Sequence, residues 1–240
     1  MYLLGCDIGC SSVKVSIIDP ESGEAIGVDC YPKEEAPIVA VHPGWAEQNP
    51  DDWWLYFEKA VVGALRKSGI SGDEICAIGI AYQMHGLVMV DKNKNVIRPS
   101  IIWCDSRAVT YGERAFHAIG EEQCLSHLLN SPGNFTASKL AWVKEYEPEN
   151  YRAIYKIMFP GDYIAMRLTG DIITTVPGLS EGIFWDFQTD TLSQDIFSYF
   201  GFSEDMIPTV VPTFGVQGEL LSSVAAELGL KKGIPITYRA

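Results

Sequence analysis

Asp7 and Lys14 are the first residues of the chain whose types and spacing could do chemistry. They stand on either side of a run of small residues, Gly9-Cys10-Ser11-Ser12, which is typical of a tight hairpin turn. Small residues let a phosphate chain approach the backbone closely, and successive N–H groups can hold an anion. A carboxylate beside such a turn suits a hydrated Mg²⁺, which prefers oxygen ligands. The segment therefore predicts a phosphate and Mg²⁺ site, with an ordinary glycine hairpin beside an acid as the alternative.

The elements that must position this turn are short and apolar. Two runs that flank it, Tyr2–Cys6 and Val13–Ile18, have the length and composition of strands, and a third strand is expected at Ala25–Tyr31. The turn lacks the G-x-x-x-x-G-K-[ST] and G-x-G-x-x-G patterns, so it is neither a P-loop nor a dinucleotide fingerprint. Three antiparallel strands joined by tight turns are therefore expected to open the fold.

Two further groups of polar residues follow expected strands. Gln83-Met84-His85-Gly86 comes just after Ile75–Ala81, a near-continuous apolar run typical of a strand buried on both faces. Trp103-Cys104-Asp105-Ser106-Arg107 follows a shorter strand expected at Ile101–Trp103. In open α/β sheets, ligands lie off the carboxyl ends of the strands, which places both groups where a site is expected. Asp105 and Arg107 could contact a ligand or form an ion pair that braces the strand end.

A helix is expected to begin at Asn49-Pro50-Asp51-Asp52, because Asn caps helices well, Pro suits the first helical position, and acids complement the helix dipole. Gly69 can end it. A crossover helix before a buried strand implies parallel pairing, so the sheet is expected to be mixed. Later helical patterns fall at Thr110–Ile119, Glu121–Leu129, Thr136–Glu147, Gly161–Leu168, Ser193–Tyr199 and Glu219–Leu228. A surface hairpin at Leu87–Val90 and Val96–Arg98, a strand at Asp171–Thr175, a small-residue loop at Pro177–Gly182 and a last strand from Gly233 complete the expectation.

Composition excludes several classes of protein. With 18 Lys and Arg against 31 Asp and Glu, the net charge is −13, which argues against a nucleic-acid partner and gives no support to binding anionic membranes. No apolar segment is long enough for a membrane span, and the N-terminus does not resemble a signal peptide. The six cysteines are scattered without a C-x-x-C pair, which favours reduced thiols in a cytoplasmic protein.

The motifs together resemble a known family. The pattern Asp7-x-Gly9-x-Ser11-Ser12-x-Lys14 resembles the first phosphate loop of sugar kinases in the actin-like ATPase superfamily. The remaining motifs resemble the FGGY carbohydrate kinases, most closely the xylulose kinases, and run in order along essentially the whole chain: Gly44-Trp45-x-Glu47-Gln48-x-Pro50-x-x-Trp53-Trp54, Gln83-Met84-His85-Gly86, Trp103-x-Asp105-x-Arg107, Pro160-x-Asp162-Tyr163 and Leu168-Thr169-Gly170. The resemblance implies an actin-like, ribonuclease-H-like α/β fold with a mixed sheet, flanking helices and a helical insertion.

The resemblance also implies an activity, namely transfer of the γ-phosphate of ATP, with Mg²⁺, to a ketopentose such as D-xylulose. Asp7 would hold Mg²⁺ through water, and Gly9, Ser11, Ser12 and Lys14 would face the phosphates. Met84 and His85 would contact the sugar, with Gln83, Trp103, Asp105 and Arg107 as further candidates. The other histidines, His42, His117 and His127, show no partner and are expected to be structural or exposed.

Residues 1–240 are expected to be the N-terminal, sugar-binding domain of such a kinase. The catalytic aspartate of the family would then lie just beyond Ala240, and most of the adenosine site would lie in a C-terminal domain that acts as the partner of this one. Cys10 departs from the Thr or Ser usual in the family, and cysteine is a weak donor. The oligomeric state is not fixed by the sequence, and a homodimer stays among the expectations.

Three alternatives remain open. The first is another FGGY kinase, acting on a polyol, gluconate or another ketose. The second is a stand-alone ligand-binding domain without catalysis. The third, a nuclease on a related fold, is disfavoured because the chain is acidic and its early strands carry no further carboxylates that could converge on a metal.

Overall fold

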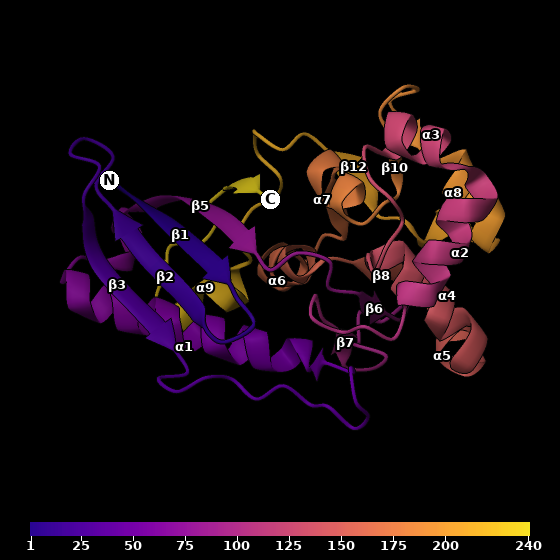
Figure 1. Cartoon of the computed structure of the whole chain (residues 1–240). Helices are drawn as coiled ribbons and strands as arrows, with labels where there is room; N and C mark the ends of the chain where they lie inside the picture. The colour runs from indigo at the N-terminus through magenta and orange to yellow at the C-terminus, as the bar shows by residue number, and fades with distance from the viewer.

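Three antiparallel strands open the fold, as the apolar runs predict. In the computed structural model, which describes residues 1–240, they are β1 (Tyr2–Ile8), β2 (Val13–Ile18) and β3 (Ala25–Tyr31). β5 (Ile75–Tyr82) pairs parallel to β1, and β13 (Ile236–Arg239) pairs parallel to β5. The sheet order is therefore β13-β5-β1-β2-β3, and the predicted mixed sheet is confirmed (Figure 1).

Helix α1 (Pro50–Ser68) covers one face of this sheet and has the ends that its sequence predicts (Figure 1). The Asn49 side chain accepts a hydrogen bond from the Asp51 N–H, and Gly69 ends the helix in the left-handed region at φ 71°. The helix approaches β3 closely because Gly27 has no side chain, since a Cβ there would lie 2.5 Å from the Ala64 carbonyl oxygen. Burial of the aromatic stripe of α1 against the sheet supplies much of this core.

The chain between β5 and β13 forms the expected helical insertion. Its helices are α2 (Val109–Ile119), α3 (Glu121–Gln123), α4 (Thr136–Tyr146), α5 (Pro148–Ala153), α6 (Pro160–Thr169), α7 (Val176–Glu181), α8 (Gln194–Phe200) and α9 (Ser222–Leu228). Its short strands are β6 (Val88–Val90), β7 (Ser100–Ile101), β8 (Lys156–Met158), β9 (Ile173–Thr175), β10 (Trp185–Asp186), β11 (Thr191–Leu192) and β12 (Thr209–Val211), and β4 (Glu47–Gln48) pairs with β7. Single turns of other helix types lie at Gly72–Glu74, Cys124–Leu128 and Glu204–Met206.

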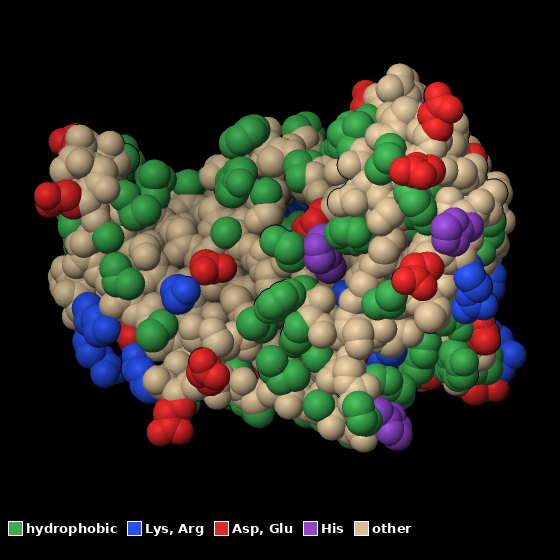
Figure 2. Space-filling model, in the orientation of Figure 1, with side chains coloured by type: hydrophobic (Ala, Val, Ile, Leu, Met, Phe, Trp, Pro, Cys, Tyr) green, Lys and Arg blue, Asp and Glu red, His purple; other side chains and the backbone are tan.

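Two hydrophobic cores result from this organisation. One lies between the five-stranded sheet and helices α1, α6 and α9, and the other lies among the remaining helices of the insertion. Tyr82, the last residue of β5, packs against both cores. The space-filling view shows a concave upper outline between two raised ends, and the C-terminus lies between the sheet and the main group of helices (Figures 1 and 2).

Several predicted elements differ from the structure. The strands expected to begin at Asp171 and Gly233 begin at Ile173 and Ile236. The expected loop Pro177–Gly182 is largely helical, since α7 spans Val176–Glu181. The hairpin expected at Leu87–Val90 and Val96–Arg98 is present, with a bridge between Val90 and Val96 and a hydrogen bond from the Ile97 N–H to the Met89 carbonyl at 2.9 Å. It is not a surface element, since β6 is buried and also pairs with β8. The strand expected at Ile101–Trp103 is Ser100–Ile101. The helix expected from Glu219 begins at Ser222, since Glu219 bridges to Pro235.

No helix combines the length and the apolar composition needed to cross a bilayer.

Candidate active site

The carboxylate of Asp7 and the ammonium of Lys14 face each other across the first hairpin. The two residues are directly paired in the β1–β2 ladder, and their charged atoms lie 3.8 Å apart. Both side chains are at least half exposed, and they line a shallow hollow on the uncovered face of the sheet together with Gly79 and Tyr238. Asp7 is the one acidic residue that lines this hollow, and a single carboxylate is compatible in its chemistry with a Mg²⁺ that keeps most of its waters.

The turn itself is tight, and hydrogen bonds to its carbonyl groups hold it in place. Gly9 N–H donates to the Ser12 carbonyl at 3.1 Å, and a Cβ on Gly9 would lie 2.9 Å from that oxygen, so glycine is required by the close approach. The carbonyl of Ser11 accepts from the Ala36 N–H at 2.8 Å. The carbonyl of Cys10 accepts from Gln48 Nε2 at 2.6 Å. The turn is therefore held by backbone contacts that leave the side chains of Ser11 and Ser12 free of protein partners.

Gln48 connects this turn to the loop after β5. Its Oε1 accepts hydrogen bonds from Trp53 Nε1 at 3.0 Å and from Gln83 Nε2 at 3.5 Å. The Gln83 N–H also donates to the carbonyl of Ile8, at the end of β1, at 2.8 Å. Two polar segments that are far apart in the sequence thus meet at the carboxyl ends of the neighbouring parallel strands β1 and β5.

The loop after β5 presents Met84 and His85. Met84 is 53% exposed, and Trp103 of the next loop is 47% exposed, so both offer apolar surface to a ligand. Gly86 is needed because a Cβ there would lie 2.6 Å from the ring of Pro160, the first residue of α6. The motifs that contain Gly86 and Pro160 therefore contact each other directly, and this contact positions the His85 loop.

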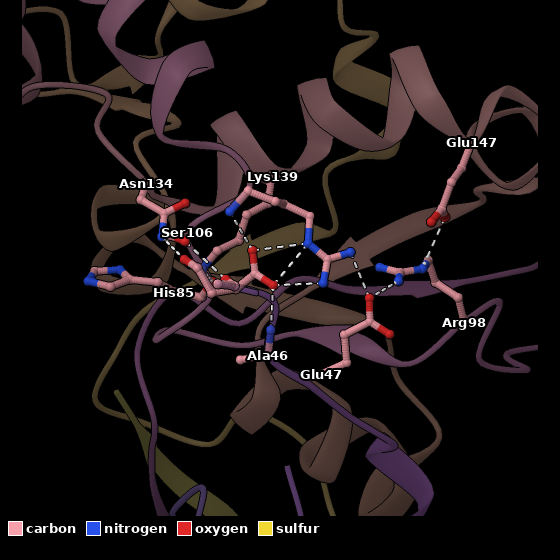
Figure 3. Close-up of polar contacts among 11 residues, drawn as sticks. Ala46, Glu47, His85, Arg98, Ser106, Asn134, Lys139 and Glu147 are labelled. Atoms are coloured by element: carbon pink, nitrogen blue, oxygen red, sulfur yellow. Dashed lines mark hydrogen bonds and ion pairs between the residues drawn. The ribbon is translucent and has the colours of Figure 1, made fainter. Parts of the chain in front are cut away.

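Asp105 and Arg107 form the ion pair that was one of their two expected roles. The Arg107 Nε lies 3.0 and 2.9 Å from the two carboxylate oxygens, and Nη2 lies 2.7 Å from Oδ2 (Figure 3). Asp105 is fully buried and also accepts from the backbone N–H groups of Ala46 and Arg107, at 2.6 and 2.8 Å. With its oxygens occupied in this way, Asp105 is suited to hold the loop rather than to contact a sugar.

Arg107 is the centre of a larger buried network. Its guanidinium lies 3.7 Å from the ring centroid of Trp45 and 4.8 Å from that of Trp142. Its Nη1 pairs with Glu47 at 2.7 Å, and Glu47 also pairs with Arg98 (Figure 3). This network joins β4, the loop after β7 and helix α4, so it fixes the position of the loop that carries Trp103.

A second buried ion pair lies at the end of β13. Arg239 Nε is 2.9 Å from Asp162 Oδ1, both side chains are fully buried, and Arg239 Nη2 donates to the Ile173 carbonyl at 3.2 Å. Burial raises the pKa of the neighbouring Tyr82 well above its ordinary value, and the Tyr82 hydroxyl has no hydrogen-bond partner. The pair fastens the last strand to α6 beside the loop that carries His85.

Lys139, in α4, is a buried cation that approaches the same loop. Its Nζ donates to the carbonyl of His85 at 2.8 Å. Burial lowers the pKa of Lys139 to about 8, although the charge of Asp105 opposes the change.

This pKa predicts a pH dependence of stability. In the unfolded chain lysine keeps a pKa near 10.4, so between pH 8 and 10.5 the unfolded state binds more protons and folding is favoured as pH rises. Relative to Lys139→Met, the wild-type chain should gain about 3 kcal/mol of unfolding free energy across this range. Urea denaturation at several pH values measures the difference, and Lys59→Met on the exposed face of α1 is the matched control. A difference that stays constant with pH would contradict a lowered pKa.

Sequence reasoning missed several residues of this region. Lys139 lies in a helix that is buried on nearly all sides, so no amphipathic pattern marked it. Glu181 contacts His85 from a segment that was expected to be a loop. His127, for which no partner was expected, pairs with Asp186 at 2.8 Å. In each case the partner is more than 50 residues away, beyond any local pattern.

Comparison with known proteins defines the class of this chain. The model of the FGGY family of carbohydrate kinases, N-terminal domain, matches residues 2–240. The chain therefore belongs to the FGGY family of carbohydrate kinases.

Several of the individual proteins that this chain resembles are xylulose kinases. The Escherichia coli xylulose kinase is 31% identical over 230 residues, which are 96% of this chain and 46% of that protein. The crystal structure of xylulose kinase from Rhodospirillum rubrum superimposes with a TM-score of 0.91 at 26% identity and covers 100% of this chain and 49% of that one. The gluconate kinase of Lactobacillus acidophilus shares the fold, with a TM-score of 0.89 at 22% identity over 100% of this chain and 48% of that one. The chain thus spans about half the length of the relatives it matches.

Proposed function

We propose that this chain is the sugar-binding half of a two-domain kinase that transfers the γ-phosphate of ATP to a ketopentose. D-xylulose, giving D-xylulose 5-phosphate, is the first candidate substrate. One observation carries the proposal: the hairpin with Asp7 and the loop with His85 lie at the ends of adjacent parallel strands and are joined through Gln48 and Gln83. The two segments that would hold the phosphate chain and the sugar are therefore neighbours in the fold.

The residues of this chain would act mainly by positioning, because phosphoryl transfer needs orientation and charge neutralisation. Asp7 would hold the hydrated Mg²⁺, which supplies positive charge to the phosphates of ATP. Ser11, Ser12, Lys14 and the Gly9 backbone would face those phosphates, while Cys10 contributes its backbone. The partner of this chain would be a C-terminal domain, and closure of the two would exclude water from the transfer.

The sugar would contact the loops of Met84 and Trp103. Their exposed apolar side chains supply surface, and Gln83 and His85 supply hydrogen-bonding groups, a combination typical of small-molecule sites. Asp105 and Arg107 would hold the Trp103 loop from below.

The proposal predicts that His85→Ala weakens binding of D-xylulose by about tenfold, the effect of losing one hydrogen bond of about 1.4 kcal/mol. Isothermal titration calorimetry of the 240-residue chain measures it, with His117→Ala on the exposed face of α2 as the matched control. Equal affinity in wild type and His85→Ala would show that His85 is not a sugar ligand. Binding of D-gluconate or glycerol in place of D-xylulose would assign another substrate to the same site.

A further inference from the structure

The backbone of His85 is held in an unfavourable conformation by two opposite charges. Its φ is 60°, in the left-handed region that non-glycine residues adopt rarely. The His85 N–H donates to the carboxylate of Glu181, at the end of α7, and the His85 carbonyl accepts from Lys139 Nζ at 2.8 Å. An anion on the N–H and a cation on the carbonyl both stabilise this residue where it is.

The imidazole ring is held by the same acid. Nδ1 lies 3.1 Å from the Glu181 carboxylate and 3.2 Å from the Glu181 main-chain carbonyl oxygen. The ring of Phe135 packs against the imidazole edge-on, with the centroids 4.3 Å apart. Figure 3 shows the ring turned away from the buried arginine network, and the side chain is 19% exposed. The ring is therefore held through Nδ1 and is partly exposed to solvent.

The identity of these partners determines where the ring proton lies. A carbonyl oxygen and an ionised carboxylate can only accept hydrogen bonds, so Nδ1 must be the donor to both. In a neutral imidazole with a proton on Nδ1, the other nitrogen, Nε2, carries none and is an acceptor.

We propose that Glu181 is a positioning residue that holds His85 in the Nδ1–H tautomer, so that Nε2 accepts a hydrogen bond from an alcohol group of the ligand. Lys139 assists by fixing the His85 carbonyl. The ligand class that follows is a sugar or polyol that presents a hydroxyl at this position, rather than a carbonyl or ether oxygen. Only the assignment of His85 to a sugar site rests on the proposed function.

The tautomer is tested by NMR of the chain labelled with ¹⁵N in its four histidines, at a pH where the rings are neutral. In the wild type, His85 should give the shifts of the Nδ1–H tautomer. His127, whose Nδ1 lies 2.8 Å from Asp186, is expected to do the same, and the exposed His42 and His117 give the reference for a free ring. An Nε2–H tautomer at His85 in the wild type would overturn the proposal, and this measurement requires no variant.

Variants of Glu181 test whether its carboxylate determines the tautomer of His85. Glu181→Ala removes the carboxylate but keeps the main-chain carbonyl of residue 181, so it should lower the Nδ1–H population of His85 without abolishing it and leave His127 unchanged. Glu181→Gln, whose amide oxygen can still accept, should keep the wild-type population. Glu149→Ala, which removes an exposed acid from α5, is the matched charge control. An unchanged His85 tautomer in Glu181→Ala would contradict the role of Glu181.

Binding of substituted sugars tests the acceptor at Nε2. Analogues of D-xylulose in which one hydroxyl is replaced by hydrogen or by fluorine are titrated calorimetrically, position by position. At the position facing His85, both replacements should weaken binding equally, by about tenfold, because neither can donate. A fluoro analogue that keeps its affinity where the deoxy analogue loses it would show that His85 donates. Absence of any D-xylulose binding would contradict the proposed function, while the tautomer would still be decided by NMR.

Discussion

Replacing Asp105 with alanine is expected to lower the free energy of unfolding by about 3–5 kcal/mol, because it removes one partner of a buried ion pair. Arg107 would stay buried with Glu47 as its remaining carboxylate, and the Ala46 N–H would lose its acceptor. Asp105→Asn should cost less, since its amide oxygen can still accept from Ala46. Urea denaturation, followed by circular dichroism, measures both.

The loss of unfolding free energy should occur for a buried ion pair but not for an exposed one. Glu149→Ala breaks an ion pair with Arg152 in which both side chains are largely exposed, and it should leave the urea midpoint unchanged. If Asp105→Ala also left the midpoint unchanged, the buried network would not be what holds the Trp103 loop in place.

The second large effect is expected at the other buried pair. Asp162→Leu should destabilise the chain by about 3–5 kcal/mol, since it leaves the fully buried Arg239 without a counter-charge. Adding Arg239→Met should restore much of the loss, because two apolar side chains of similar volume can replace a buried ion pair at little cost. The double-mutant cycle, measured by urea denaturation, gives the coupling between the two residues.

An additive double variant would contradict this account. It would mean that Asp162 and Arg239 act through separate contacts, such as the hydrogen bond from Arg239 to the Ile173 carbonyl. Strong coupling would instead show that the pair itself fastens β13 to α6, next to Tyr82 and the His85 loop.

Helix ends and strands that depend on residues close together in the sequence could be predicted. The cap at Asn49, Gly69 at the end of the helix and the apolar runs of β1 and β2 act within a few residues, and each is confirmed. The pairing of β6 with β8 could not be predicted in the same way, since about 70 residues separate the two strands. Distant pairing is decided by the packing of the whole domain.

In the candidate site, too, local patterns predicted some residues and distant packing decided the others. The rule that ligands lie at strand ends predicted a site at the His85 loop, whereas Asp7 was singled out by the small-residue turn beside it. The sheet brings the two to adjacent parallel strands. The sequence left two roles open for Asp105 because an exposed ligand and a buried ion pair require the same residue types. The contribution of Lys139 and Glu181 depends on where α4 and α7 pack, which no local pattern encodes.

The presence of two separate cores gives each part of the molecule its own fluorescent reporters. Trp53 and Trp54 are buried against the sheet, whereas Trp142 and Trp185 are buried among the helices of the insertion. Unfolding observed at one pair of indoles therefore says nothing by itself about the other core. Only when both transitions coincide does a single unfolding free energy describe the whole chain.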